Sequence, residues 1–396
     1  MTQRRRPWPA AVVALALLAA GCGSGAAGEA GPVVTVTERT TVVASVVVSG
    51  TSSTASDAVV ATTRTPSSTR PTSSSRPPAT STAPPEGTFT LALAGDVNFS
   101  ERTRDRLDDP ATAFGVAAAG LARADLTMLN LETAITEAGE QQDKSYTFRA
   151  PASALDALWG AGVDVATMAN NHAADYGASG LQDTLAAIGG SDLPVIGVGA
   201  DAAAAYAPFE TTVRGVPLSV FAVTAVREQT LANFTAGPDS AGVASAFEPE
   251  LVAGVRKAAK AGRTVVVYLH WGTEYEACPD GDQQALANEL AAAGASAVVG
   301  THAHVLQGAG WRSDGVYVAY GLSNYLWWRS FGNEQDDNGV LTLSFTGRKV
   351  TAASFAPAHL DDAGIPVPAT GATRERILQQ WDDDRECAGL AAAPPR

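Results

Sequence analysis

Aromatic residues are distributed unevenly along this chain, and their distribution fixes where a packed core can begin. No Phe, Tyr or Trp occurs between Pro9 and Thr88, whereas every Phe and Tyr and six of the seven Trp lie from Phe89 onward. Large aromatic side chains supply much of the apolar area that a domain buries. We therefore expect one folded domain over residues 87–360, rather than two domains of equal size, in this chain of 396 residues.

The first 22 residues are typical of an export signal. Arginines 4–6 precede an apolar stretch of 11 residues, 10–20, and Cys22 follows after Gly21. The stretch is too short to cross a bilayer. The arrangement resembles the signal of bacterial lipoproteins, in which the cysteine is lipidated, and this resemblance implies an exported protein that is lipid-anchored to the outer face of the cell membrane. The alternative is an ordinary cleaved signal with an incidental Cys22.

Residues 23–86 form a predicted disordered linker. In residues 62–85, 19 of the 24 positions are Ser, Thr or Pro, and such a segment has too little apolar area to offset the entropy lost on folding. As a flexible coil it would reach roughly 45 Å. This length suits a stalk that lifts a domain away from a membrane.

The acidic charge of the chain lies on the predicted domain. The formal net charge is −14 at pH 7, and the four acids and four arginines of residues 23–86 cancel. Proteins bind nucleic acid chiefly through cations that contact its phosphates. We therefore expect no nucleic acid partner.

Two cysteines remain once Cys22 is assigned to the lipid. An exported protein lies where disulfides persist, so we expect a bridge between Cys278 and Cys387; two free thiols are the alternative. The bridge would hold the predicted C-terminal tail, residues 361–396, to a loop. Within that tail we expect a helical patch over residues 373–381, and we expect Trp381 and the three aspartates after it to form a solvated end.

From Phe89 onward, short apolar runs alternate with Ala-rich helical patterns. The expected strands cover residues 89–94, 126–131, 163–168, 195–198, 218–223, 264–269, 295–299 and 315–320. The expected helices cover residues 153–161, 181–188, 249–261 and 282–293. Residues 340–355 are typical of a hairpin with its turn at Gly347-Arg348. This alternation predicts an α/β domain.

Polar side chains follow most of these strands at their carboxyl ends, where α/β sheets bind ligands. In chain order they are Asp96, Asn98, Asn130, Glu132, Asn170, Asn171, His172, Asp175, His270, His302, His304 and Asn324. Four of the five histidines of the chain are among them. Imidazole, carboxylate and amide oxygen together suit Zn²⁺, Mn²⁺ or Fe. Each residue alone could serve only in hydrogen bonding, capping or a turn, but the joint pattern predicts a metal site.

These clusters, in this order, resemble the CapA family, which is named for a capsule poly-γ-glutamate synthesis protein and falls within the calcineurin-like metallophosphoesterase superfamily. The resemblance covers about residues 87–360. It implies a four-layer αββα sandwich, in which two central sheets are flanked by helices. It also implies an exported, membrane-anchored protein that acts on or near an extracellular polymer.

The resemblance further implies roles for single residues. The metal ligands would be Asp96, Glu132, Asn171, His270, His302 and His304. Glu132 would bridge two ions, with Asn130 as the second candidate, and His172 would be the catalytic histidine that stabilises or protonates the leaving group. The superfamily has a histidine where this chain has Asn98, so one tightly held ion with a weak or absent second remains open beside two ions.

We therefore expect a metal-dependent hydrolase whose substrate is a phosphoester or an amide in a poly-γ-glutamyl or cell-wall chain. The expected partners are an anionic or peptide envelope polymer, the membrane through the N-terminal lipid, and other capsule-synthesis membrane proteins. A non-catalytic polymer-binding or export factor with a structural or vestigial metal site is the alternative that Asn98 favours. A third interpretation, an extracellular binding module without metal, conflicts with the placement of the histidines.

Overall fold

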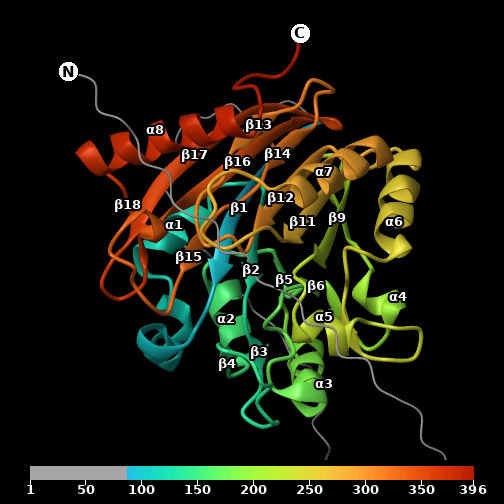
Figure 1. Ribbon diagram of the computed structural model, residues 1–396, viewed down its shortest axis with the longest axis vertical. Helices are drawn as coiled ribbons and strands as arrows, with labels where there is room; N and C mark the ends of the chain where they lie inside the picture. The colour runs from blue at the N-terminus through green and yellow to red at the C-terminus, as the bar shows by residue number, and fades with distance from the viewer. Residues whose placement is uncertain (1–86) are drawn as a thin grey trace, which may run out of the picture. The chain divides into compact units, whose positions relative to one another are not determined.

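Two β-sheets packed face to face form the centre of the structure, a computed structural model that describes residues 87–396 (Figure 1). The predicted signal peptide, the lipidation site Cys22 and the predicted linker lie outside the described residues. These three predictions therefore stay predictions.

The larger sheet has the strand order β18-β17-β16-β1-β2-β5-β6, and β15 pairs with the end of β1. Its strands are β1 (Thr88–Val97), β2 (Leu126–Leu131), β5 (Val165–Thr167), β6 (Val195–Ile196), β15 (Asn324–Leu326), β16 (Asp337–Thr346), β17 (Lys349–Leu360) and β18 (Pro366–Pro368). Strands β15, β1, β2, β5 and β6 are parallel, and β16 to β18 are antiparallel. The carboxyl ends of the parallel strands therefore lie at one edge.

The smaller sheet has the order β13-β14-β12-β11-β9-β8. Its strands are β8 (Phe209–Val213), β9 (Val216–Thr224), β11 (Thr264–His270), β12 (Ala297–Thr301), β13 (Ala309–Trp311) and β14 (Tyr317–Ala319). Strands β9, β11, β12 and β14 are parallel. Two short pairs lie outside the main sheets: β3 (Ala134–Ile135) with β4 (Arg149–Ala150), and β7 (Val198–Gly199) with β10 (Gly242–Val243).

Helices cover the outer face of each sheet. They are α1 (Ala118–Leu121), α2 (Ser153–Gly160), α3 (Gly177–Gly189), α4 (Ala202–Ala205), α5 (Gln229–Phe234), α6 (Pro249–Lys260), α7 (Gly281–Ala293) and α8 (Gly371–Cys387). The first three pack on the larger sheet, and α6 and α7 pack on the smaller one. The order helix, sheet, sheet, helix confirms the predicted four-layer αββα sandwich.

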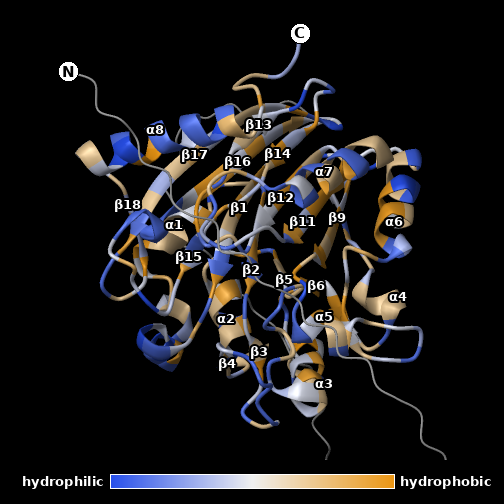
Figure 2. Ribbon diagram, in the orientation of Figure 1, coloured by the Kyte–Doolittle hydropathy of each residue, from blue (hydrophilic) through white to orange (hydrophobic). Residues whose placement is uncertain are grey.

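The strand sequences are apolar on both faces because both faces are covered. In β1, Leu91 and Leu93 face the other sheet, whereas Ala92 and Ala94 face the helices. Buried parallel strands characteristically read as continuous apolar runs, and Figure 2 shows this apolar character over the central strands. Each fully buried large aliphatic side chain contributes about 1.5–3 kcal/mol to stability.

The C-terminal tail packs on the domain, and the prediction that Trp381 belongs to a solvated end is wrong. Trp381 in α8 is 4% exposed, and its ring stacks on that of Phe355 in β17 at 4.0 Å between centroids. Ile377, four residues earlier on the same helix face, is also buried. A single apolar stripe in an otherwise polar helix is sufficient to hold α8 against the sheets.

A disulfide joins Cys278 to Cys387, with their Cα atoms 5.8 Å apart. It links the loop before α7 to the last residue of α8. Among the residues that the structure describes, no helix has both the length and the apolar character of a membrane span.

Candidate metal centre

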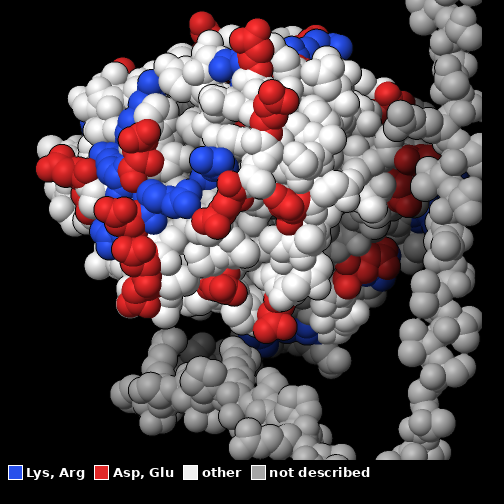
Figure 3. Space-filling view, turned by 90° about the horizontal axis from the view of Figure 1, so that it is seen from below, with Lys and Arg blue, Asp and Glu red and all other residues white. Residues whose placement is uncertain are grey.

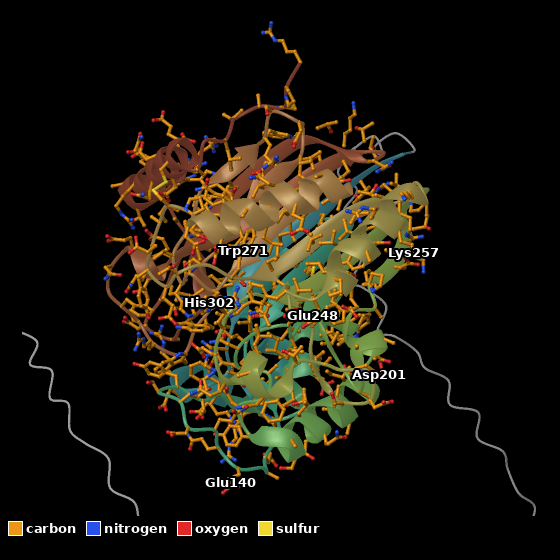
Figure 4. All side chains as sticks on the ribbon, turned by 45° about the vertical axis from the view of Figure 1, so that its right-hand side comes forward. Glu140, Asp201, Glu248, Lys257, Trp271 and His302 are labelled. Carbon is orange, nitrogen blue, oxygen red and sulfur yellow. A yellow bond between two sulfur atoms is a disulfide. The ribbon has the colours of Figure 1, made fainter. Side chains whose placement is uncertain are left out.

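Carboxylates and imidazoles from both sheets meet at the carboxyl ends of the parallel strands. The register explains the meeting: Asp96 of β1 lies opposite Asn130 of β2 and Asn324 of β15, and His270 of β11 lies opposite Thr301 of β12. Figure 4 labels His302, the residue that directly follows β12, in the region where the sheets end and the loops begin.

Two overlapping groups of side chains could each hold a divalent cation. The ligand atoms of Asp96, Glu132 and His270 all lie within 4.8 Å of one another, and so do those of Glu132, His302 and His304. All five side chains are buried. Because Glu132 belongs to both groups, it lies between the two candidate ion positions.

The chemistry of Glu132 fits a bound cation. Both of its carboxylate oxygens are buried and have no hydrogen-bond partner. Its closest basic atoms are Nε2 of His270 at 3.5 Å and Nε2 of His172 at 3.7 Å. Burying a carboxylate without hydrogen bonds is costly even beside imidazoles, and a cation between these groups would offset that cost.

The pKa shifts reflect crowded charges. Burial and the nearby charge of Glu132 together raise the pKa of Asp96 to about 6, against the opposing effect of His270. Burial also acts to raise the pKa of Glu132, but the surrounding histidines hold it below its usual range. Burial and the charges of His270 and His304 lower the pKa of His302 well below its ordinary value. His302 is therefore neutral at pH 7, as a metal-binding imidazole must be.

Asn171 turns its amide oxygen toward the same group. Its Oδ1 lies 2.9 Å from Nε2 of His270, and its Nδ2 donates to Glu228 at 3.2 Å. Its backbone carbonyl accepts from Lys144 and Thr230. The structure thus brings together all six residues that the resemblance assigned to the metal.

His172 lies beside this group with its ring oriented by Asp175. Its Nδ1 is 2.6 Å from a carboxylate oxygen of Asp175, so Nδ1 carries the proton and Nε2 faces Glu132. The ring packs against Phe148 at 4.4 Å between centroids. In this orientation, Nε2 can accept or donate a proton at the edge of the candidate metal site.

The amide of Asn98, which stands where the superfamily has a histidine, is used inside the protein. Its Nδ2 donates to the backbone carbonyl of Glu132 at 2.8 Å, and its Oδ1 accepts from the backbone of Ser100. Asn130, the second candidate for the bridge, donates to Asp96 at 2.7 Å and accepts from Asn170. Both asparagines therefore position carboxylate residues, and of these two candidates only Glu132 lies in both ligand groups.

Sequence reasoning missed several residues that support the site. Lys144 lies between Asp175 and Glu228, with Nζ 3.1 Å from a carboxylate oxygen of each. Lys144 lies far from the end of any predicted strand, so the pattern could not find it. Glu228 lies five residues after the predicted strand 218–223, and that loop was the signal that could have found it. The buried ring of Trp327 packs 4.9 Å from that of His304.

The loop that carries the paired histidines has an unusual backbone. His302 and His304 have φ angles of 90° and 54°, in the left-handed region that side chains rarely adopt. Opposite them, Gly95 allows a close approach, because a Cβ there would lie 1.8 Å from the carbonyl oxygen of Ser323. Backbone strain of this kind is concentrated at functional sites.

Comparison with known proteins gives one family and several relatives. The family described as "Bacterial capsule synthesis protein PGA_cap" matches residues 90–327. The capsule biosynthesis protein CapA of Bacillus anthracis is 27% identical over 312 residues, which cover 76% of this chain and 74% of that protein. The PGA biosynthesis protein CapA of Bacillus subtilis is 30% identical over 232 residues, 56% of this chain and 60% of that protein.

Among solved structures, a phosphatase described as novel from Mycoplasma pneumoniae aligns with 74% of this chain and 96% of its own length, with a TM-score of 0.44 and 13% identity. The NAD nucleotidase of Haemophilus influenzae aligns with 77% of this chain and 64% of its own length, with a TM-score of 0.39 and 13% identity.

Proposed function

This chain belongs to the PGA_cap family of bacterial capsule synthesis proteins, and we propose that it is a metal-dependent hydrolase that acts on a capsule or cell-envelope polymer. The observation that carries the proposal is Glu132, whose two buried oxygens lack hydrogen-bond partners and which belongs to both candidate ligand groups. A non-functional core would not place such a carboxylate among four buried histidines.

Asp96, Glu132, Asn171, His270, His302 and His304 would hold one or two divalent ions of Mn, Zn or Fe. A bound ion supplies an activated water and polarises the scissile group. Asp96 is fixed for its role because one carboxylate oxygen accepts from Asn130 and the other from the backbone of His302. His304 is oriented by Asn324, whose Oδ1 lies 2.7 Å from its Nδ1.

His172 would exchange a proton with the substrate through Nε2. Its Nδ1 is held by Asp175, and Lys144 in turn lies 3.1 Å from Asp175. This chain of contacts fixes the tautomer and the ring plane, which is what a general acid or base requires. The nearly complete burial of the site excludes most water around the reacting group.

We also propose that the protein is exported and anchored by a lipid on Cys22, outside the described residues. The Cys278–Cys387 disulfide supports an oxidising compartment. The substrate would be a phosphoester or an amide in an anionic or peptide envelope polymer, and other capsule-synthesis membrane proteins would be partners. The names of relatives from Bacillus anthracis and Mycobacterium tuberculosis refer to capsule biosynthesis and polyglutamine synthesis, which agrees with such a polymer.

A non-catalytic polymer-binding or export factor is the second candidate function. The observation that favours it is Asn98, whose amide is committed to Glu132 and Ser100 and contributes no metal ligand. Such a factor would bind the polymer equally well when His172 is replaced.

Metal analysis combined with a hydrolysis assay tests the proposal. Purified protein should contain transition metal and should hydrolyse phosphodiesters or γ-glutamyl chains, and His172→Ala should abolish hydrolysis while it retains the metal. His359→Ala is the matched control, because His359 is the one histidine outside the site and is paired with Asp337. Protein that lacks metal after growth in Mn- and Zn-rich medium would contradict the hydrolase.

A further inference from the structure

Arg329 is a cation without an acidic partner beside the candidate metal centre. Its guanidinium carbon lies 4.4 Å from the ring centroid of Phe331, 5.2 Å from that of Trp328 and 5.5 Å from that of Tyr146. Within residues 87–396, no ion pair joins Arg329 to an Asp or Glu. Ion pairs are made by Arg104, Arg214, Arg263, Arg312, Arg376 and Arg385. Arg329 differs from Arg149 and Arg227, which each lie over a single ring, in the three rings that surround it.

Two tyrosines hold the guanidinium from opposite sides. Its N–H groups point to the hydroxyl oxygens of Tyr146 and Tyr275, each at 3.4 Å. Burial and the neighbouring Glu274 raise the pKa of Tyr275 above its ordinary value. Tyr275 is therefore an uncharged phenol at pH 7, and the positive charge of Arg329 is not neutralised by it. We refer to Arg329 with Tyr146, Tyr275, Trp328 and Phe331 as the Arg329 cluster.

The Arg329 cluster is connected to both sides of the candidate centre. The ring of Tyr275 lies 6.2 Å from that of His304, and its backbone N–H donates to the carbonyl of Ala303, between His302 and His304, at 2.7 Å. Tyr275 holds a left-handed φ of 66° there, a conformation that non-glycine residues rarely adopt.

On the other side, contacts lead to His172. The ring of Tyr146 lies 6.0 Å from that of Trp328, and Trp328 lies 5.6 Å from Phe148. Phe148 packs on His172 at 4.4 Å. Contacts thus connect Arg329 to His304 through Tyr275, and to His172 through Tyr146, Trp328 and Phe148.

A cavity continues away from this position. It has a volume of about 330 Å³ and is lined by Tyr146, Phe148, Trp328, Arg104 and Arg149 among others. On the face seen in Figure 3, basic side chains gather in a band among acidic ones, although the chain as a whole carries a formal charge of −14. The cavity thus offers space next to Tyr146 and Trp328 of the Arg329 cluster, with Arg149 as a further cation in its lining.

We propose that Arg329 forms an oxyanion-binding subsite that holds a negatively charged group of the substrate next to the reacting bond. A guanidinium presents several N–H donors in one plane and binds carboxylates or phosphates in a bidentate manner. The inference rests on the proposed function, because that function places the reacting bond at the metal centre. It adds that the substrate carries an oxyanion near that bond.

The test is a binding measurement by titration calorimetry in a His172→Ala background, where turnover does not interfere. The probes are a short γ-linked glutamate oligomer, the same oligomer with its α-carboxyl groups amidated, and a glycerol phosphate oligomer. Arg329→Gln should weaken the binding of an anionic oligomer about tenfold or more, as expected for the loss of one charge-assisted hydrogen bond. The amidated oligomer should bind Arg329→Gln and its parent equally.

Two further variants separate charge from structure. Arg329→Lys keeps the charge but loses the planar pair of donors, so it should retain only part of the affinity, more than Arg329→Gln does. Arg348→Gln removes the same charge from the exposed turn between β16 and β17, at the opposite end of β1, and should leave all affinities unchanged. Whichever anionic oligomer responds to Arg329→Gln identifies the group as a carboxylate or a phosphate.

The inference is overturned if Arg329→Gln weakens binding of the charged and amidated oligomers equally, if it weakens neither, or if the parent protein binds neither anionic oligomer. If Arg329→Gln weakens only the binding of charged oligomers, but the protein with His172 intact hydrolyses nothing, the subsite stands and the proposed hydrolase is contradicted. If the protein with His172 intact hydrolyses its substrate, but Arg329→Gln causes no charge-selective loss of binding, the hydrolase stands and the subsite is contradicted.

Discussion

Asp96 and Glu132 lie in the same buried group, yet their pKa values shift in opposite directions. Burial and the negative charge of Glu132 raise that of Asp96 to about 6, whereas the histidines lower that of Glu132 despite its burial. Asp96 thus takes up a proton more readily than an ordinary carboxyl, and Glu132 less readily. This division is a property of the metal-free site, and a bound cation would favour ionisation of both.

The shift of Asp96 predicts a pH dependence of stability in the metal-free protein. Because its folded pKa of about 6 exceeds its ordinary value of 3.8, the folded state binds the proton more tightly. The stabilisation is present below pH 4 and is lost as the pH rises to about 6, by an amount on the order of 3 kcal/mol. Urea unfolding in chelator should show this loss in the wild type and not in Asp96→Asn. Identical pH profiles for the two proteins would refute it.

Lys144 illustrates a residue whose importance only the structure reveals. Its side chain is 7% exposed and pairs with Asp175, which is fully buried, and with Glu228. Lys144→Met would leave a buried carboxylate without its cation, a change that costs about 3–5 kcal/mol. Denaturant unfolding should show this loss. Arg104→Gln, which breaks an exposed pair with Glu137, should change stability by less than about 1 kcal/mol; an equal effect of both substitutions would rule out this role for Lys144.

Among elements, long apolar runs were predicted well and short or polar ones were not. The segment 264–269 became β11, and the hairpin turned at Gly347-Arg348 as expected. In contrast, β15 has three residues, too few to show a pattern, and it is not among the expected strands. The helix α8 was predicted over too few residues, because its apolar stripe consists mainly of Ile377 and Trp381.

The packing of α8 on the sheets gives a prediction at the level of the element. Trp381→Ala should destabilise the protein by about 3–5 kcal/mol, because it empties a buried position stacked on Phe355. Trp159→Ala is the matched control, since Trp159 in α2 is 49% exposed. Thermal unfolding measures both. If the two substitutions lowered the melting temperature equally, α8 would not be held through Trp381.

In the whole molecule, residues more than two hundred positions apart meet because parallel strands share an edge. The order of polar clusters after successive strands was sufficient to predict that Asp96, His270 and His304 lie together, and the structure brings them together. The supporting contacts could not be predicted, because they depend on side chains from loops such as Lys144 and Arg329. Local pattern thus identifies groups at strand ends, whereas three-dimensional packing decides which loop residues reach them.

The central claim is that one buried set of side chains from both sheets binds a divalent cation. A crystal structure of the Mn- or Zn-loaded protein, with anomalous scattering recorded at the edge of that metal, tests it most directly. We predict an anomalous peak about 2.0–2.3 Å from a carboxylate oxygen of Glu132 and from imidazole nitrogens of the surrounding histidines. A loaded crystal with no peak at Glu132, or with its metal elsewhere, would contradict the account.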